Sequence, residues 1–224
     1  MTRSRHADNR SILAGRAAAY VPGPRGVENA PLQDLSALVG AGSVWSAARD
    51  LHRFVEAIVS GRLGQGPRLS FVRQGRLDFN GRTGGFKAWA LYDSVTRTEA
   101  IFAGNVATGA PDWLKRDILR LAAGETAKPP VLPNLNSDVL ESELLRWVGV
   151  YRIQNGPRLD LHVRDGALYS NDWVLLSTAD GGLFSPRDYG TVRGVEGSDG
   201  RFARLDWTQG GETYQAPRVV DGGR

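Results

Sequence analysis

Apolar residues recur at helical spacing in one stretch of the first half of the chain, over residues 46–60. The stripe consists of Leu51, Phe54, Val55, Ile58 and Val59. Steps of three and four residues place such side chains on one face of a helix, which then packs against a core. Ser46 can cap the first turn and Gly61 can end the last. The pattern predicts a helix over 46–60, with His52 beside the apolar stripe as a packing residue.

A hairpin and a second helix are expected next. Residues 85–92 and 98–104 have the composition of strands, and Asp93-Ser94 between them is a turn signal. Apolar side chains occur on both faces of 85–92, which is typical of a strand that is covered on both sides. Apolar residues then return to helical spacing and predict a helix over 111–123, which ends at Gly124.

A proline-rich stretch separates two halves of different texture. Residues 124–142 lack periodicity and read as a linker, with three prolines in 124–136. A short helical turn over 143–147 follows, and then short strands separated by turn signals. These strands are expected at 159–163, 173–176, 189–192, 202–207 and 213–215. Their spacing of roughly 8–12 residues indicates an antiparallel barrel or sandwich. We therefore expect one domain over 1–123 and a barrel over 143–220.

Composition excludes several functional classes. The net charge is only +4 and no run of five basic residues occurs, so a nucleic-acid-binding stripe is not expected. The chain has no cysteine, which removes disulfides, zinc–thiolate sites and a cysteine nucleophile. No apolar run approaches the ~18 residues of a membrane span. The basic start of the chain is a poor signal peptide, and the sequence leaves localisation open.

Residues 79–93, FNGRTGGFKAWALYD, raise a question about function because two glycines enter a strand pattern. Glycine weakens a strand, since it loses more chain entropy than other residues and packs nothing. Gly84 and Gly85 therefore indicate one of two situations. Either the chain bends or bulges there, or another group must approach the backbone closely.

Several short segments resemble those of the serine β-lactamase-related hydrolases, the group of class C β-lactamases, DD-peptidases and esterases. Residues 40–54, GAGSVWSAARDLHRF, are similar to the group's G-A-G-G-x-x-S-T-x-x-D-L-x-R-F segment. GRTGGF at 81–86 is similar to its K-T-G or H-x-G-G box, and FAGN at 102–105 to its closing L-S-N. LLRWVGVY at 144–151 resembles the start of a trailing lipocalin-like domain, and Met1–Arg5 an internal G-M-x-x-T piece.

This resemblance implies an α+β fold: the C-terminal portion of a β-lactamase/transpeptidase-like domain, with antiparallel strands packed by helices, followed by a small antiparallel β-barrel. It covers nearly the whole chain but only the later part of the hydrolase domain. A truncated gene product, a mis-assigned start or half of a split enzyme would each account for that. The sequence thus resembles a bacterial hydrolase of the penicillin-binding-protein-like kind.

The resemblance also implies a substrate-binding site at Arg82, Thr83, Gly84, Gly85 and Phe86. In the family this strand borders the active-site groove, so the two glycines would let an acyl group lie against the backbone. Arg82 would stand where Lys or His usually stands and could bind a substrate carboxylate. Thr83 could hydrogen-bond the same group. No cofactor is implied.

The family's reactive groups are missing from the chain. No serine is followed three residues later by lysine, so the Ser-x-x-Lys nucleophile pair is absent. The single Tyr-x-Asn match, Tyr169-Ser170-Asn171, lies in the expected barrel and is taken as coincidence. His6, His52 and His162 are too scattered to predict a metal site.

Three functions remain open on these grounds. The chain is part of a serine hydrolase that transfers acyl groups of β-lactams, D-peptides or esters, and is inactive alone. Alternatively it is a non-catalytic ligand-binding or regulatory module, or a small-ligand carrier that acts through the barrel. The expected partners are a small-molecule or peptide acyl substrate, with no nucleic acid and no membrane span. Self-association is also expected, through apolar surface exposed around Trp45, Phe86 and Trp89.

Overall fold

The computed structural model describes residues 1–6, 11–38, 42–66, 71–127 and 131–219. Within these residues the chain forms two compact units. The first comprises residues 1–21, 27–107 and 111–127, and the second comprises residues 22–26, 108–110 and 131–219, in each case where they are described.

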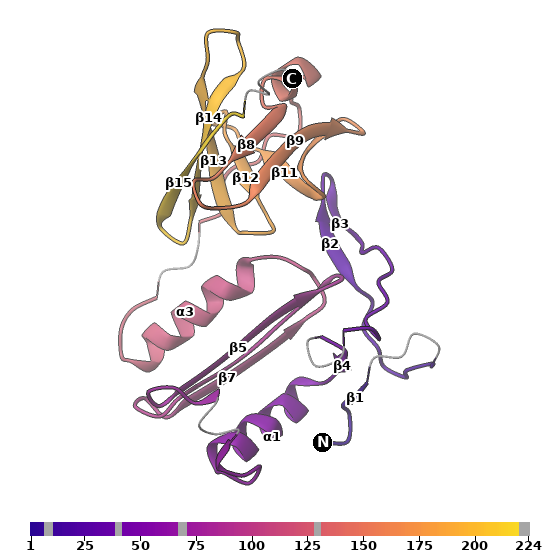
Figure 1. The fold of residues 1–224 in the computed structure, drawn as a ribbon, viewed down its shortest axis with the longest axis vertical. Helices are drawn as coiled ribbons and strands as arrows, with labels where there is room; N and C mark the ends of the chain where they lie inside the picture. The colour runs from indigo at the N-terminus through magenta and orange to yellow at the C-terminus, as the bar shows by residue number, and fades with distance from the viewer. Residues whose placement is uncertain (7–10, 39–41, 67–70, 128–130, 220–224) are drawn as a thin grey trace. The chain divides into compact units, whose positions relative to one another are not determined.

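The first unit is built on a three-stranded antiparallel sheet in the order β5-β6-β7 (Figure 1). The strands are β5 (Arg76–Thr83), β6 (Phe86–Asp93) and β7 (Thr98–Gly104). Helix α1 (Ala48–Val59) packs its apolar stripe on one face, where Val55, Ile58, Leu77 and Ala90 form a core. Neighbouring residues on a strand point to opposite faces. Trp89 therefore points to the other face, and its indole nitrogen donates a hydrogen bond to the carbonyl of Pro111 in helix α3 (Ala110–Ala122), at 3.0 Å.

Two short strand pairs lie outside this sheet. β1 (Arg5–His6) pairs antiparallel with β4 (Val44–Trp45), and β2 (Tyr20–Gly23) pairs with β3 (Gly26–Asn29). Neither pair was predicted from the sequence.

The second unit is an up-and-down antiparallel sheet of eight strands in sequential order that is nearly closed into a barrel. Its strands are β8 (Gly149–Arg152), β9 (Arg158–Arg164), β10 (Ala167–Ser170), β11 (Trp173–Ser177), β12 (Leu183–Ser185), β13 (Gly190–Glu196), β14 (Phe202–Gln209) and β15 (Glu212–Pro217). An antiparallel bridge between Tyr151 and Arg218 brings the first strand to the last. Closure removes the unpaired edges that an open sheet presents.

One end of the barrel is filled by side chains. Helix α4 (Glu141–Leu145) supplies Leu144, and the next turn supplies Trp147, whose ring lies 4.3 Å from that of Phe202 at the start of β14. Apolar residues at alternate strand positions continue this core, among them Leu161, Leu168, Leu175, Leu183, Val192 and Leu205. The opposite end, where β14 finishes, lacks such a plug within the described residues and forms the mouth.

The predicted α+β fold class is wrong, because the protein is mostly β, with 41% of residues in strands and 16% in helices. In the two larger sheets, the prediction overlooked β5, in which Gly81 and polar residues obscure the alternation, and the short strands β8, β10 and β12. The predicted helix over 46–60 is observed as α1, but Ala47 is its N-cap and makes no side-chain cap bond. No helix among the described residues has the length and hydropathy that crossing a bilayer requires.

Candidate functional site

The predicted substrate-binding residues form the turn of the β5–β6 hairpin. Thr83 pairs directly with Phe86, so Gly84 and Gly85 are the two turn residues between the strands. Gly85 has a φ of +86°, a conformation that residues with a Cβ rarely adopt. The expected strand over 85–92 therefore begins one residue later, at Phe86.

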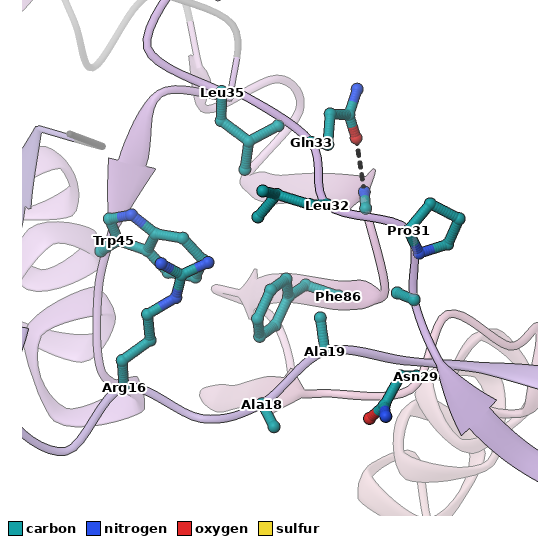
Figure 2. Close-up of a pocket in the computed structure, with 12 residues that line it drawn as sticks. Arg16, Ala18, Ala19, Asn29, Pro31, Leu32, Gln33, Leu35, Trp45 and Phe86 are labelled. Carbon is teal, nitrogen blue, oxygen red and sulfur yellow. Dashed lines mark hydrogen bonds between the residues drawn. The ribbon is translucent and has the colours of Figure 1, made fainter. Parts of the chain in front are cut away.

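The group that approaches these glycines is the chain itself. A Cβ at Gly85 would lie 2.7 Å from the Cβ atoms of Ala19 and Ala30, closer than any real contact of that kind. The backbone nitrogen of Gly84 donates a hydrogen bond to Oε1 of Gln33, at 3.0 Å (Figure 2). Both interpretations of the glycines thus hold together: the chain turns here, and its own N-terminal segment lies against the turn.

A cavity of about 230 Å³ lies beside this turn (Figure 2). Phe86 packs edge-on against Trp45, with ring centroids 5.0 Å apart, and the Arg16 guanidinium lies 4.5 Å from the Trp45 ring. Of the predicted site residues, Gly84 and Phe86 line this cavity. Its described lining holds no serine, cysteine, histidine or lysine, so the cavity offers no nucleophile or base.

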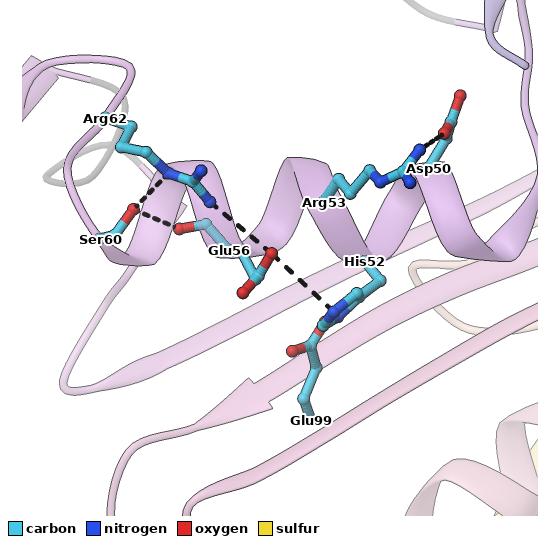
Figure 3. Close-up of polar contacts among 7 residues, drawn as sticks. All are labelled: Asp50, His52, Arg53, Glu56, Ser60, Arg62 and Glu99. Atoms are coloured by element: carbon cyan, nitrogen blue, oxygen red, sulfur yellow. Dashed lines mark hydrogen bonds and ion pairs between the residues drawn. The ribbon is translucent and has the colours of Figure 1, made fainter. Parts of the chain in front are cut away.

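The remaining predicted features lie apart from this cavity. Trp89 is only 2% exposed, so the apolar surface expected around it is not present. Arg82 and Thr83 are half-buried at the end of β5 and do not line the cavity. His52 contacts Glu99 and Glu56 on the first unit's surface (Figure 3). No group of metal-ligating side chains occurs in the described parts of the chain.

A larger cavity of about 430 Å³ occupies the barrel mouth. Loops and strand ends from the whole mouth line it: Ile153, Gln154, Asn155, Gly156, Pro157, Leu159, Ser170, Asn171, Trp173, Leu175, Ser185, Arg187, Asp188, Trp207, Gln209 and Tyr214. Ser170 and Asn171 belong to the Tyr-x-Asn match at residues 169–171. The other residues were not predicted as a site.

Two serines form the polar floor of this mouth cavity. Ser170 is 6% exposed and Ser185 is 1% exposed, and each shares an inward face with a core leucine, Leu168 and Leu183 respectively. The Ser185 hydroxyl donates to Oδ2 of Asp188 at 3.1 Å and lies 3.4 Å from that residue's backbone nitrogen. No partner for the Ser170 hydroxyl occurs among the described residues.

Aromatic side chains form the wall of the mouth cavity. Trp207 on β14 and Tyr214 on β15 are directly opposite each other, so they share the inward face. Trp173 also faces inward, two residues before the core residue Leu175, and the Arg187 guanidinium lies 4.4 Å from its ring. The wall is therefore aromatic, with a cation over one ring.

Hydrogen bonds hold the loop over 185–188 in place at the rim. The backbone nitrogen of Gly109 and the hydroxyl of Thr108 both donate to the carbonyl of Pro186, at 3.0 and 2.7 Å. Nε2 of Gln209 donates to the backbone carbonyl of Asp188 at 3.1 Å. A pre-positioned rim of this kind favours binding, because less ordering is needed when a ligand enters.

The described lining of the mouth cavity carries the kinds of groups that bind small molecules. Its lining, as described, contains two serines but no histidine, lysine or cysteine. A serine nucleophile needs an adjacent base, and neither serine has a nitrogen base beside it in this lining. The lining does combine aromatic surface with hydroxyl, amide and charged groups, which is typical of small-molecule sites.

Comparisons with known proteins supply no family. No family model matches the chain, and no curated protein matches it. Two solved structures of SurE are similar, both at 18% identity. One gives a TM-score of 0.37 and covers 97% of this chain, which spans 60% of that chain's length. The other, SurE with D-Leu, gives 0.32 and covers 64% of this chain and 35% of the other. Scores this low support no conclusion about fold or function.

These findings correct the resemblance to serine β-lactamase-related hydrolases. The assignment is wrong, because no family model and no curated protein of that group matches the chain. The description as a penicillin-binding-protein-like hydrolase is wrong with it. The quoted segments are short, and GRTGGF is accounted for by a hairpin turn packed against residues 19–33. The expected acyl-transfer activity depended on that resemblance.

Proposed function

We propose that this protein is a non-catalytic binding protein that holds a small molecule in the mouth of its barrel. The observation that carries the proposal is the pair of buried serine hydroxyls beneath an open aromatic wall. Apolar residues normally fill the inward positions of a small barrel. Ser170 and Ser185 occupy such positions at the mouth end, while leucines occupy them deeper in the barrel.

The position of the Ser170 hydroxyl supports this proposal. Ser170 is 6% exposed and lines the cavity, and its oxygen is not among the described side-chain atoms that are buried without a partner, so it is accessible from the cavity. A ligand oxygen or nitrogen that enters the cavity can hydrogen-bond to this hydroxyl, which both donates and accepts.

The dimensions and wall of the cavity support it as well. A volume of about 430 Å³ falls within the ~300–1,000 Å³ range of small-molecule sites. Tyr214 is 45% exposed although it points inward, so its ring is accessible from the mouth. Aromatic rings with an accessible face contribute large contact areas at low entropic cost.

The test is a titration of the full chain with the fluorescent probe N-phenyl-1-naphthylamine, followed by energy transfer from tryptophan. We expect saturable binding at one site, because Trp173 and Trp207 lie in the cavity lining. Tyr214→Ala should weaken binding about tenfold, since it removes the exposed ring, whereas Tyr214→Phe keeps the ring and should change it little.

The control uses a serine at the other end of the same barrel. Ser177→Ala lies at the far end of β11 and should leave the affinity unchanged. If Tyr214→Ala left the affinity for the probe unchanged, the proposal would be contradicted, because the probe would then bind apolar surface elsewhere.

A further inference from the structure

We infer that the ligand of the barrel mouth is an uncharged polyhydroxylated ring compound, that is, a neutral sugar or cyclitol. The inference rests on the proposed function and names the class of molecule that the same cavity takes. Three properties of the lining carry it: its charge balance, the kinds of hydrogen-bonding groups, and the arrangement of the rings.

The charges of the lining cancel. Arg187 and Asp188 are the one cation and the one carboxylate among its described residues, and Nε of Arg187 lies 4.0 Å from Oδ1 of Asp188. The guanidinium also lies over Trp173, and the carboxylate accepts the Ser185 hydroxyl. A charged ligand would have to compete with one of these neighbours. A neutral ligand leaves the pair intact and avoids the desolvation of an added charge.

The polar groups of the lining offer donors and acceptors together. They include the Ser170 hydroxyl, the amides of Gln154 and Asn155, and the Asp188 carboxylate. The Ser185 hydroxyl and the amides of Asn171 and Gln209 also line the cavity but already bond within the protein. A hydroxyl or amide side chain can both donate and accept, and a sugar hydroxyl donates one hydrogen bond and accepts two, so such a ligand suits these groups.

The rings of the wall suit the other face of such a ligand. The negative face of an aromatic ring attracts weakly positive hydrogens. The C–H bonds of a pyranose or cyclitol ring gather on one side and present such hydrogens. Tyr214 offers an exposed ring opposite the buried Trp207, and Trp173 lies across from loop 185–188. One side of the ligand can therefore stack while its rim of hydroxyls bonds to the polar groups.

A flat hydrocarbon fits this cavity less well. It would cover the Ser170 hydroxyl and the amides of Gln154 and Asn155 without pairing them, and each buried unpaired polar group is unfavourable by about 1–3 kcal/mol. The aromatic wall alone therefore does not identify the ligand. The polar floor beneath the wall favours a ligand with many hydroxyls.

The test is isothermal titration calorimetry of the full chain with methyl β-D-glucopyranoside, cellobiose, N-acetylglucosamine and myo-inositol. Benzoate and benzamidine serve as charged comparators of similar ring size. We expect at least one neutral compound to bind at one site and to displace N-phenyl-1-naphthylamine. Raising the salt concentration about tenfold should leave its affinity unchanged, because salt screens only charges.

Matched variants locate the binding. Ser170→Ala should weaken binding of the neutral compound about fivefold through the lost hydrogen bond, and Ser177→Ala should not. Tyr214→Ala should weaken it about tenfold, and Tyr214→Phe should restore most of the loss.

The outcomes separate this inference from the proposed function. If the naphthylamine probe binds in the mouth but no neutral compound binds or displaces it, the inferred class is overturned and the binding mouth stands. The class is also overturned if benzoate or benzamidine alone binds with a strong salt dependence. If neither the probe nor any sugar responds to Tyr214→Ala, the proposed function fails as well.

Discussion

Tyr214 lies directly opposite Trp207 across the β14–β15 pair, yet Trp207 is 6% exposed and Tyr214 is 45% exposed. Two cross-strand neighbours on one inward face thus mark the border between the barrel core and its mouth. Trp207→Ala should therefore lower the free energy of unfolding by about 3–5 kcal/mol, as large core truncations do. Tyr214→Ala should lower it by less than about 1 kcal/mol. Urea unfolding of both variants measures the difference, and equal losses would contradict this border.

The turn glycine of the β5–β6 hairpin is expected to resist substitution for two separable reasons. Gly85→Ala introduces strain at a φ of +86° and a clash with Ala19, Ala30 and the backbone of Tyr20. Gly124→Ala introduces similar strain, at +79°, but meets no atom within 4 Å. We expect the control to lower stability by about 1 kcal/mol and Gly85→Ala to lower it clearly more. Thermal unfolding measures both, and equal effects would show that residues 19–30 do not pack on the turn.

A histidine on α1 is expected to make the first unit more stable in mild acid. The hydrogen bond from His52 Nδ1 to Glu99, at 2.7 Å, and the charge of Glu99 raise the pKa of His52 above 6.5 (Figure 3). Glu56 also raises this pKa, while burial and Arg53 lower it. A group whose pKa is higher in the folded state than in the unfolded state stabilises the fold. This stabilisation is fully present at pH values below the unfolded-state pKa, and it is lost as pH rises through the folded-state pKa.

The matched comparison is the difference in unfolding midpoint between wild type and His52→Gln at about pH 5.5 and about pH 8.5. The advantage of the wild type should shrink at the higher pH. Glu99→Gln should remove most of this pH dependence, since it removes the charged partner of His52. Parallel pH profiles for wild type and His52→Gln would contradict the prediction.

A buried aspartate in the β6–β7 turn is expected to contribute to stability in the opposite direction. Hydrogen bonds from the backbone nitrogens of Thr96 and Val95, and from Arg76, hold the pKa of Asp93 below its usual range despite its burial. A group whose pKa is lower in the folded state than in the unfolded state stabilises the fold at pH values above the unfolded-state pKa. This stabilisation is lost as pH falls through the folded-state pKa.

Asp93→Asn should therefore lower the unfolding midpoint at neutral pH and reduce its fall between about pH 5 and pH 2. Asp172→Asn, at an exposed turn position, is the control and should follow the wild type. An Asp93→Asn variant with the acid profile of the wild type would show that the turn does not depend on the carboxylate.

Strong local patterns in the sequence predicted α1 and the β6–β7 turn, but local patterns could not predict the candidate site in the barrel mouth. The apolar stripe that includes Val55 and Ile58 follows helical spacing throughout. The Asp93 carboxylate accepts a hydrogen bond from the backbone of the turn that follows it in the chain, so this turn depends on neighbouring residues. The barrel mouth depends on which strand positions point inward at one end. Neither Ser170 nor Ser185 lies in a predicted strand, and only the observed register places them beside core leucines.

The local pattern around the glycine pair was informative only in part, for a related reason. A local pattern signals that something lies close to Gly85, but it cannot name the neighbour. Only the fold shows that the neighbour is a segment more than fifty residues earlier in the chain, at Ala19 and Ala30. Of the mouth residues, the sequence drew attention only to Ser170 and Asn171, through a Tyr-x-Asn match at residues 169–171 that was taken as coincidence.

The most direct measurement of the central claim uses the indole N–H signals of the six tryptophans in the NMR spectrum of the ¹⁵N-labelled full chain. Single Trp→Phe variants assign each signal. On titration with cellobiose or N-phenyl-1-naphthylamine, the signals of Trp173 and Trp207 should shift together and saturate, since both side chains line the mouth cavity. Shifts confined to Trp45, Trp89 or Trp113 of the first unit, with Trp173 and Trp207 unmoved, would contradict ligand binding in the barrel mouth.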